Sequence, residues 1–514
     1  MTNQYKNTYD LVVVGGGVAG LYFTYQYLKK NSKAKILLIE SKTRLGGRIL
    51  TNKHKKETYE IGAGRFSNHH TQLKQLLEEL KLEKKIIPLK SKTTFFSKEG
   101  NPNSKLNFDS LLITALAQIG LYLEKENLEA KDLRKFTLYN LLKVLDPTVA
   151  INLDKIYPYY SELHVMNAYD ALESFERDFR ESVSYSVLKG GLEQIITELH
   201  QKIKRKVTIK LADHLCHLEK ITNGWKLELG SGKNYLASNL VLALPRKPLL
   251  ELDALKEIHP LLGLVEGQPL YRIYAKFNKK WLKKKIITDS DLKFIIPIND
   301  DGLIMISYTD GPLTEKWLNA QIEGKLENEL LKELRKVFPK IEIPDILWID
   351  GSGYWEVGAH YWIPRTNYPD QEALIEKITH PMENLYLVGE AYSSHQAWIE
   401  GALRTVELAL KNFNENSEKP LLKVKSEPLG QGGKGKSNTK YSLKEVAKHN
   451  SRKDGWLVIK GKVYDVTSWI SRHPGGDIIL RGLGKDATQM FQNFRHSARA
   501  EKILKDYQIG ILDS

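Results

Sequence analysis

The sequence predicts an α/β domain with a doubly wound sheet, a mixed α+β domain interleaved with it, and a small α+β domain at the C-terminal end. Residues 9–14 are a short apolar run that ends in glycines, a helical pattern continues to about residue 30, and a second apolar run spans 35–40. This strand, helix and strand order is how a doubly wound sheet begins. Residues 414–440 are rich in Gly, Lys and Ser, which predicts a flexible linker before the last domain.

The other elements are predicted from the spacing of apolar residues. Leu73, Leu76 and Leu77 recur at helical spacing, and similar patterns continue through the following hundred or so residues. In order, the predictions are a mostly helical region over 66–185, strands over 206–245 and 270–310, a long helix over 313–337, a buried strand over 384–388 and a helix over 399–412.

The composition is typical of a folded protein with roughly three domain-sized units. The chain has 514 residues, of which 41% are hydrophobic and 27% are charged, which excludes wholesale disorder. The single cysteine, Cys216, excludes an intrachain disulfide, a Cys-based zinc site and an iron–sulfur cluster within one chain. Residues 1–10 are polar and give no secretory signal, so we expect a reducing, cytoplasmic location.

The positive charge is spread along the chain. There are 77 Lys and Arg residues against 62 Asp and Glu, a net charge of +15, but no recognition motif accompanies them. We therefore expect a solvated surface and no nucleic-acid partner. The longest weakly charged stretch, 111–123, is too short to span a bilayer, and no apolar segment precedes Ser514, so we expect no membrane anchor. The oligomeric state does not follow from the sequence.

The turn after the first strand carries a binding signal. It reads Gly15-x-Gly17-x-x-Gly20, so the backbone is free to approach a pyrophosphate, and the next helix offers unpaired N–H groups and a partial positive charge. Glu40 ends the second strand and is placed to accept hydrogen bonds from both ribose hydroxyls. The turn and the acid together predict a dinucleotide site.

The segment 44–48, Arg-Leu-Gly-Gly-Arg, follows directly and offers a second close backbone approach. With it, the sequence resembles the flavin amine oxidase family over about residues 8–413, including Lys-Gly-Gly-Leu at 189–192 and Leu-Val-Gly-Glu at 387–390. The resemblance implies FAD, bound non-covalently because no cysteine lies near residue 398. The FAD contacts that it implies are Gly15, Gly17, Val18, Ala19, Gly20, Glu40, Arg48, Gly62, Ala63, Gly64, Arg65, Val207, Gly389, Glu390, Trp398 and Ile399.

The heptad 60–66, Glu-Ile-Gly-Ala-Gly-Arg-Phe, resembles a segment of L-amino-acid oxidases and tryptophan monooxygenases. In those enzymes the arginine pairs with the substrate α-carboxylate, which implies this role for Arg65. The alternative is that Arg65 is a surface or FAD-contacting residue. Trp398 and Trp355 match aromatic residues that flank the substrate in the family, and Tyr361 and Trp362 are alternatives to Trp355.

One position departs from the family. Its members commonly have a lysine that holds a water near flavin N5, on the strand matching residues 270–277. No lysine occupies the matching place here, and Tyr271 or Arg272 is a possible replacement. His69, His70 and His395 are interpreted as surface or supporting polar groups rather than as bases.

The activity implied is oxidation of the Cα–N bond of an L-amino acid, by hydride transfer to flavin N5. Electrons then pass to oxygen, to a redox protein or to a fused haem. A monoamine or polyamine oxidase, an amino-acid monooxygenase and a catalytically idle flavohaem scaffold are the alternatives. Arg65, Trp355 and Trp398 are the residues to which the resemblance assigns the substrate.

Residues 441–512 resemble cytochrome b5. The match includes Gly455-Trp456, His-Pro-Gly-Gly at 473–476, and Phe-Arg-His-Ser at 494–497. It implies a b-type haem with His473 and His496 as axial ligands, which leaves the iron no open position and suits electron transfer. The 414–440 linker would span about 30 Å and keep this haem near the flavin.

The predicted domain boundaries follow from these assignments. They are an FAD-binding domain of residues 1–65, 186–250 and 380–413, a substrate domain of residues 66–185 and 251–379, the linker 414–440, and a haem domain of residues 441–514.

Overall fold

The computed structural model describes residues 7–89, 93–97, 107–179, 183–366, 370–416, 439–467, 469–470, 479–480, 482–493 and 504–513. The chain divides into two compact units, Met1–Leu422 and Lys423–Ser514. Among the described residues, no helix combines the length and the apolar character that a bilayer crossing requires. The finer division of the first unit into two discontinuous domains stays a prediction.

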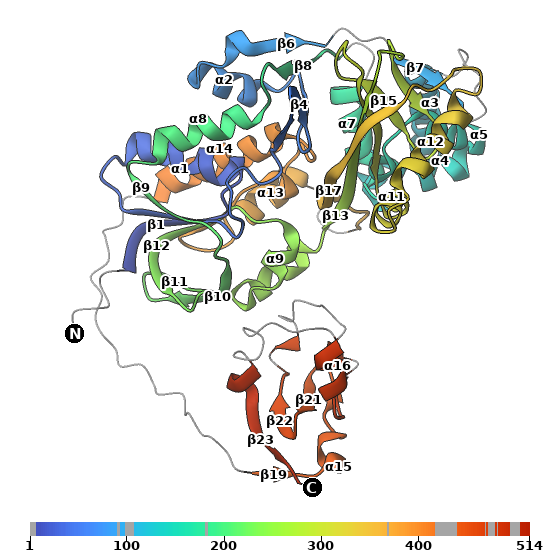
Figure 1. Ribbon diagram of the computed structural model, residues 1–514. Coiled ribbons are helices and arrows are strands. Elements are labelled where there is room, and N and C mark those ends of the chain that lie inside the picture. Colours follow the sequence, from blue (N-terminus) through green and yellow to red (C-terminus); the bar gives the residue numbers. More distant parts are fainter. Residues whose placement is uncertain are drawn as a thin grey trace. The chain divides into compact units, whose positions relative to one another are not determined.

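A seven-stranded sheet lies in the first unit (Figure 1). In chain order its strands are β1 (Thr8–Val14), β2 (Ile36–Ile39), β9 (Val207–Lys210), β10 (Leu215–Ile221), β11 (Gly224–Leu229), β12 (Asn234–Leu242) and β18 (Leu385–Leu387). β1 pairs in parallel with β2 and β12, β9 extends the parallel part beyond β2, and β18 pairs in parallel with the end of β12. β10 and β11 are added as an antiparallel ribbon. The predicted doubly wound α/β domain is confirmed.

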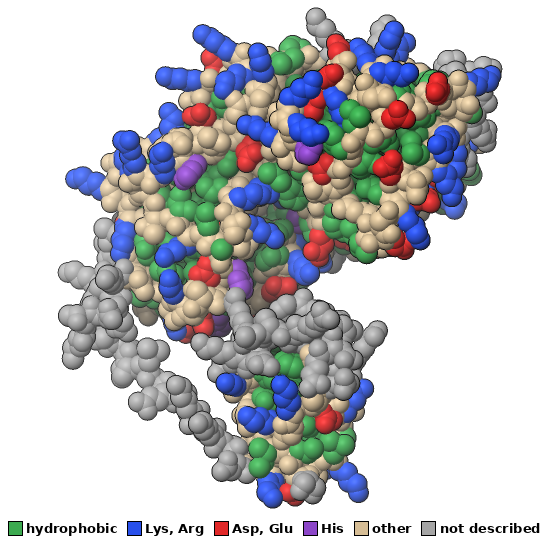
Figure 2. Space-filling model, viewed as in Figure 1, with side chains coloured by type: hydrophobic (Ala, Val, Ile, Leu, Met, Phe, Trp, Pro, Cys, Tyr) green, Lys and Arg blue, Asp and Glu red, His purple; other side chains and the backbone are tan. Residues whose placement is uncertain are grey.

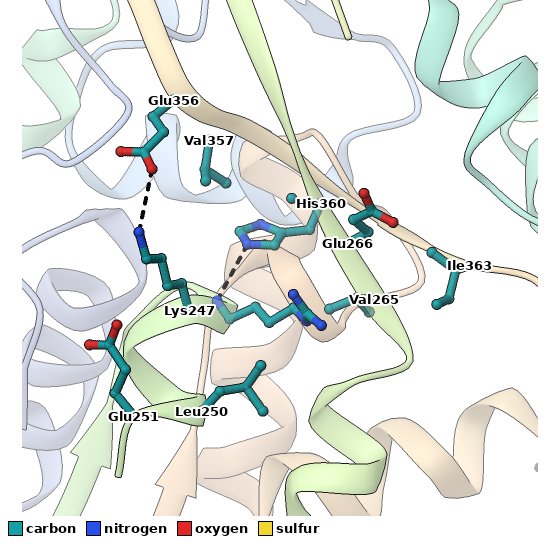
Figure 3. A pocket seen from close by; sticks show the side chains of 11 residues that line it. Lys247, Leu250, Glu251, Val265, Glu266, Glu356, Val357, His360 and Ile363 are labelled. Carbon is teal, nitrogen blue, oxygen red and sulfur yellow. Dashed lines mark hydrogen bonds and ion pairs between the residues drawn. The ribbon is translucent and has the colours of Figure 1, made fainter. Parts of the chain in front are cut away.

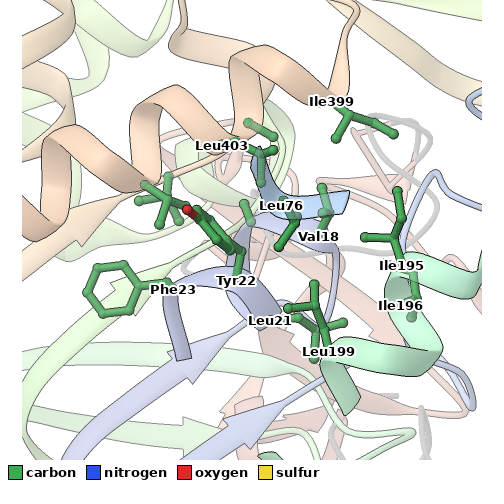
Figure 4. Packing of buried hydrophobic residues seen from close by; sticks show 14 of the residues in the cluster. Val18, Leu21, Tyr22, Phe23, Leu76, Ile195, Ile196, Leu199, Ile399 and Leu403 are labelled. Carbon is green, nitrogen blue, oxygen red and sulfur yellow. The ribbon is translucent and has the colours of Figure 1, made fainter. Parts of the chain in front are cut away.

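Alternation along β1 sends side chains to both faces of this sheet, and both faces are covered. Leu11 and Val13 pack on one side with α1 (Val18–Lys30), α8 (Glu193–Ile203) and α14 (Ile399–Asn416), as Figure 4 shows for the helices. Val12 and Val14 pack on the other side among residues of α9, α10 and α13. The Gly-rich end of β1 is therefore held between two apolar layers.

A six-stranded sheet forms the second part of this unit, in the order β17-β13-β16-β15-β14-β7. Its strands are β7 (Thr93–Phe96), β13 (Val265–Phe277), β14 (Lys285–Thr288), β15 (Phe294–Pro297), β16 (Leu303–Asp310) and β17 (Ile346–Trp362). The helices that accompany it are α3 (Phe108–Lys125), α4 (Leu138–Leu145), α5 (Pro147–Ile156), α6 (Tyr160–His164), α7 (Ala168–Ser174), α11 (Leu313–Ile322) and α12 (Leu326–Val337). One helix-rich cluster packs against β15 and β16, and another joins α11 and α12 to β13.

Two sequence predictions are corrected here. The helix predicted over 313–337 is two helices, because Gly324 lies between α11 and α12 with φ of +69°, a conformation that ends a helix. The last helix of the first unit, α14, continues to Asn416 rather than ending near 412. It therefore enters the segment predicted as linker, of which residues 417–438 lie outside the described residues.

The remaining elements are short. They are β3 (Thr51–His54), β4 (Glu57–Glu60), β5 (Phe66–Ser67), β6 (Ile86–Pro88), β8 (Tyr185–Leu188), α2 (Thr71–Glu79), α9 (Arg246–Leu250), α10 (His259–Leu262), α13 (Gln371–Thr379), the 3₁₀ turns η2 (Glu83–Lys85), η3 (Ala130–Lys135), η5 (Asp253–Ile258) and η6 (Glu390–Tyr392), and the π-turn η4 (Phe175–Phe179).

The second unit is a small α+β domain, as predicted. Its five-stranded sheet has the order β19-β23-β22-β21-β20. The elements are β19 (Lys440–Tyr441), α15 (Leu443–Val446), β20 (Asn450–Ser451), β21 (Asp454–Ile459), β22 (Lys462–Asp465), α16 (Thr488–Asn493), the 3₁₀ turn η9 (Lys505–Tyr507) and β23 (Gln508–Leu512). The predicted haem ligands His473 and His496 lie outside the described residues.

A pair of glycine substitutions tests the packing of the first turn. At Gly20 an added Cβ would lie 2.0 Å from the carbonyl oxygen of Gly15, whereas at Gly120, within α3, it would meet nothing within 4 Å. We expect Gly20→Ala to destabilise the first unit by about 3 kcal/mol or more and Gly120→Ala to stabilise it by about 0.5–1 kcal/mol. Calorimetric unfolding of both variants checks this, and equal effects would contradict the proposed close approach.

Candidate FAD and substrate site

Two glycine segments lie against each other at the end of β1. The N–H of Gly46 donates to the carbonyl oxygen of Gly16 at 2.8 Å, and Gly17 and Gly46 form a parallel bridge. A Cβ at Gly17 would meet only the Cα of Gly47, at 4.0 Å, so the space above this turn is open. Open space beside a helix N-terminus fits a pyrophosphate. Val18, Ala19 and Gly20 form the first turn of the α1 helix that provides it.

Glu40 is where the sequence predicts a ribose contact, and it also holds the glycine turn. One carboxylate oxygen accepts from the N–H of Gly16 at 2.7 Å, and the other accepts from the N–H of Lys42 at 2.8 Å. The oxygen that accepts from Lys42 also accepts from the hydroxyl of Ser41 at 3.2 Å, whereas the oxygen bound to Gly16 keeps a further lone pair that can accept a ribose hydroxyl.

Val207 does not reach Glu40. It pairs with Ile36 at the opposite end of β2 and is buried in the core. The segment that lies beside Glu40 comes after β9, where Asp213 donates its N–H to the carbonyl oxygen of Glu40 at 3.1 Å. The FAD contact predicted for Val207 stays a prediction.

Glu390 joins three separate segments of the site. One of its oxygens lies 2.5 Å from a guanidinium nitrogen of Arg48 and 2.6 Å from Nδ1 of His360, and the other accepts from the N–H of Ala397 at 3.0 Å. Burial alone would raise the pKa of Glu390, but the charge of Arg48 and the interactions with His360 hold that pKa well below its usual range. Gly389 precedes it with φ of +139° and donates to Thr405.

The segment 62–64 follows the backbone of Arg48. Ala63 donates its N–H to the carbonyl oxygen of Arg48 at 3.0 Å, and a Cβ at Gly62 would lie 1.9 Å from that same oxygen. At Gly64 a Cβ would lie 2.7 Å from a guanidinium nitrogen of Arg272. The heptad that carries Arg65 is thus positioned between the predicted FAD segment and β13.

Arg65 lies among aromatic side chains. It donates to the hydroxyl of Tyr159 at 3.1 Å, and its guanidinium carbon lies 4.3 Å from the ring centre of Tyr185. The Tyr185 ring is stacked with Trp398 at 6.3 Å and an interplanar angle of 17°. Tyr185 therefore contacts both Arg65 and Trp398, and the structure brings these two predicted site residues together. Neither tyrosine could be identified from sequence spacing.

The other predicted aromatic residues differ in position. Trp355 donates its indole N–H to the carbonyl oxygen of Ile61 at 3.0 Å, so it packs beside the 60–66 segment. Tyr361 and Trp362 are core residues, and Trp362 donates to the carbonyl oxygen of Ser393 at 2.9 Å. Trp355 is therefore the one of the three that contacts the 60–66 segment by a described hydrogen bond, and the assignment of the substrate aromatic stays a prediction.

Tyr271 and Arg272, the two candidates for the position of the family's lysine, point to opposite sides of β13. Tyr271 is buried and donates to the carbonyl oxygen of Gly351 at 2.8 Å, within the cluster that α11 and α12 cover. Arg272 points to the other side of β13 and donates to the carbonyl oxygen of Glu60 at 3.3 Å. Of the two possible replacements, Arg272 lies beside the 60–66 segment, and its role there stays a prediction.

The histidines are more buried than the sequence suggests. His69 is exposed, but His70 is fully buried, and its ring lies 4.7 Å from that of Trp398. His395 is buried as well, and burial lowers its pKa to about 3, so it is neutral at physiological pH.

Helix α14 begins at Ile399, directly after Trp398. Its first turn contains the buried Glu400, which accepts hydrogen bonds from the N–H groups of Gln72 and Leu73 at 3.2 and 3.0 Å. Glu400 thus satisfies the free N-terminal N–H groups of α2, whose own N-cap residue makes no side-chain bond. Ile399 itself packs in the core.

A cavity of about 430 Å³ opens beside the Glu390 network (Figure 3). Its charged lining includes Arg246, Lys247, Glu356 and His360. Arg246 donates its N–H to Nε2 of His360 at 3.4 Å, and Lys247 lies 3.5 Å from Glu356. The Nε of Arg246 has no hydrogen-bond partner among the described residues. Elsewhere on the face shown in Figure 2, Lys and Arg side chains are scattered, with Asp and Glu among them.

In the second unit, apolar side chains line a core that includes Leu457, Val466, Ile470 and Leu483, with Phe491 packed against them. This composition fits the apolar faces of a porphyrin.

Comparison with known proteins agrees with these two parts. Residues 18–409 match the flavin containing amine oxidoreductases, and the chain belongs to that family. Residues 442–513 match the cytochrome b5-like heme/steroid binding domain. The FAD-dependent oxidoreductase class and the FAD and haem cofactors are confirmed at this level, and the individual site residues stay predictions.

Individual relatives match parts of the chain. Cytochrome b5 of Borago officinalis is 51% identical over 75 residues, which are 14% of this chain and 57% of that protein. A cytochrome B5-like protein of Arabidopsis thaliana is 40% identical over 115 residues, 22% of this chain and 91% of that protein. The crystal structure of a putative protoporphyrinogen oxidase from Exiguobacterium sp. 255-15 has a TM-score of 0.60 at 17% identity, covers 80% of this chain and 100% of its own, and shows the fold.

Glu60 gives a pH-dependent prediction. Burial raises its pKa to about 7, although the N–H of Leu192 and the hydroxyl of Thr51 donate to it. The folded protein then keeps a proton that the unfolded chain loses above pH 4.5, so stability falls as the pH rises from 4.5 to about 7.

Between pH 4.5 and 7 the free energy of unfolding should fall by about 3 kcal/mol because of Glu60, and we expect Glu60→Gln to remove this fall. The thermal midpoint of the first unit at pH 5 and pH 8 measures it. Glu219→Gln, at an exposed ion pair with Lys226, is the control. An unchanged pH slope in Glu60→Gln would show that Glu60 ionises normally.

Proposed function

We propose that this protein oxidises the Cα–N bond of an L-amino acid. The observation that carries the proposal is Arg65, which has no carboxylate within 4.0 Å among the described residues and shares the Tyr185 ring as a neighbour with Trp398. A half-buried guanidinium without an acidic partner is suited to an anionic substrate group.

FAD would be held by the glycine turn, by Glu40 and by the segment at Arg48, and when bound it accepts the electron pair of the Cα–H bond. Arg65 would fix the α-carboxylate, which limits the rotation of the substrate and orients that bond. Trp398 and Tyr185 would exclude water from the amine. No acid–base pair is needed if the amine binds neutral or loses its proton on entry. The product imino acid hydrolyses to a keto acid and ammonia.

The electron acceptor is oxygen, a separate redox protein or the fused b-type haem. A haem held by His473 and His496 would supply single-electron transfer. The substitution of Arg272 at the family's lysine position supports an acceptor other than oxygen, because that lysine serves the oxygen step by holding a water.

Three alternatives remain testable by product and substrate. A monoamine or polyamine oxidase needs no carboxylate partner, an amino-acid monooxygenase yields an amide, and an idle flavohaem scaffold is reduced by none of these substrates. Anaerobic bleaching of the flavin with amino acids and with amines distinguishes an amine oxidase and an idle scaffold from an amino-acid oxidase. Product analysis distinguishes a monooxygenase, which yields an amide.

Arg65→Gln tests the role of Arg65. Loss of a charged hydrogen-bonding partner should raise the Michaelis constant for an L-amino acid by about 10- to 100-fold. A simple amine should be affected by less than about twofold, because it has no carboxylate to lose. Steady-state kinetics with both substrates measure the difference, and partial recovery is expected in Arg65→Lys. Equal effects on both substrates would remove the carboxylate assignment.

The haem ligands are tested by spectra of the full-length protein. We expect His473→Ala and His496→Ala each to lose the low-spin Soret spectrum of two axial imidazoles. His449→Ala is the matched control, because His449 pairs with Asp454 and stacks on Trp456. A normal spectrum in either ligand variant would contradict the assignment.

A further inference from the structure

Three aromatic rings from different elements form one contact group beside Arg65. Tyr159 precedes α6, Phe294 begins β15 and Tyr308 lies on β16. Their ring centres are 5.2 Å apart for Tyr159 and Phe294, 5.4 Å for Tyr159 and Tyr308, and 5.8 Å for Phe294 and Tyr308. We call these three residues the aromatic group.

Each member of the aromatic group contacts a different cationic side chain. Arg65 donates to the hydroxyl of Tyr159 at 3.1 Å. The guanidinium carbon of Arg272 lies 4.4 Å from the ring centre of Tyr308, and the Nζ of Lys285 lies 4.7 Å from that of Phe294. Three positive groups from three segments thus surround one aromatic surface.

The guanidinium of Arg272 has no carboxylate within 4.0 Å among the described residues, although the charge of Arg272 acts on the nearby carboxyl of Glu60 and opposes the rise of its pKa. It donates to the backbone carbonyl of Glu60 at 3.3 Å, and its Nε has no hydrogen-bond partner among the described residues. The Glu60 carboxylate is engaged elsewhere, since it accepts from the N–H of Leu192 at 2.6 Å and from the hydroxyl of Thr51 at 2.9 Å. A buried charge of this kind is costly unless a partner arrives.

Two further acids lie nearby, Asp310 and Glu162, and neither forms an ion pair within 4.0 Å with Arg65, although the charge of Arg65 acts on Glu162. Asp310 accepts from the N–H groups of Tyr160 and Ser161, each at 2.8 Å. Burial, with the charge of Asp310, raises the pKa of Glu162, which favours its neutral form. In the part of the chain that the structure describes, no carboxylate lies within 4.0 Å of Arg65, Arg272 or Lys285.

Lys285 shows the effect of this excess of positive charge. Burial lowers its pKa to about 7, and the charge of Arg65 contributes in the same direction. An anion that binds beside Lys285 would raise the pKa of this lysine and so favour its charged form.

We propose that Arg272, supported by Lys285, binds a second acidic group, so that the substrate is an L-amino acid with an acidic side chain. The assignment of the first acidic group to Arg65, and of the oxidised amine, rests on the proposed function. The second group is inferred from Arg272 and Lys285 themselves, and it makes Arg272 a specificity-determining residue.

The first experiment measures binding without chemistry. Glutarate and pentanoate have the same chain length but two and one carboxylates, and neither has an amine to oxidise. We expect the full-length holoprotein to bind glutarate at least about tenfold more tightly than pentanoate by calorimetry, because the second carboxylate gains a charged hydrogen bond. Arg272→Gln should abolish the difference in affinity between glutarate and pentanoate. Lys316→Gln should keep this difference, since Lys316, which lies on α11, is already paired with Asp291. Equal binding of both acids by the wild-type protein would overturn the proposal even if a variant fails to fold.

The second experiment separates this proposal from the proposed function. Anaerobic reduction of the bound flavin is followed with L-glutamate, L-aspartate, L-glutamine, L-asparagine and L-leucine. We expect the acidic amino acids to be preferred by about tenfold or more, with Arg272→Gln removing that preference and Arg272→Lys restoring part of it. Reduction without preference for acidic side chains would overturn the second acidic group and leave amino-acid oxidation standing. Reduction by amines alone would overturn amino-acid oxidation, while the glutarate result would still report on Arg272.

Discussion

The carboxylate of Glu390 links segments that are far apart in the sequence. Arg48 comes from the second glycine segment, His360 from the end of β17, and Ala397 from the turn before α14. Glu390 and His360 are buried and Arg48 is partly exposed, so the Glu390 carboxylate depends on these partners for its solvation. Because Ala63 and Gly62 follow the backbone of Arg48, the position of the substrate segment depends on the same network. The position of Arg65 therefore depends on Arg48, which belongs to the predicted FAD-binding segment.

The proposed substrate region shows the reverse situation, because Arg65, Arg272 and Lys285 have no carboxylate within 4.0 Å among the described residues. Aromatic faces reduce the cost of holding Arg65, Arg272 and Lys285 together, because rings attract cations, but they do so less than a carboxylate would. Sites that leave charges unpaired in the absence of ligand have more to gain when a complementary group binds. This contrast distinguishes the substrate region from the Glu390 network, where every charge is matched.

The features that could be predicted from the sequence are those that depend on short local patterns of residues. The glycine turn, Glu40 and the Arg48 segment follow from short motifs whose geometry is set within a few residues, and the family resemblance extended them to Glu390. The position of Val207 opposite Ile36, in contrast, depends on the pairing of β9 with β2, which spacing does not show. Tyr159, Tyr185, His360 and Lys285 come from distant elements, and only tertiary packing brings them to the site. The break at Gly324 could have been found, since a glycine within a helical pattern is a recognised stop signal.

The carboxylate of Glu400 has a consequence for how this region unfolds. It belongs to the first turn of α14 but satisfies the backbone of α2, so neither helix terminus is complete without the other. Fraying of α14 would leave unpaired N–H groups at the start of α2, and fraying of α2 would leave Arg404 as the remaining partner of the buried Glu400 carboxylate. The two helices should therefore open together as one cooperative unit in hydrogen exchange, and Trp398, one residue before α14, would lose its support in the same event.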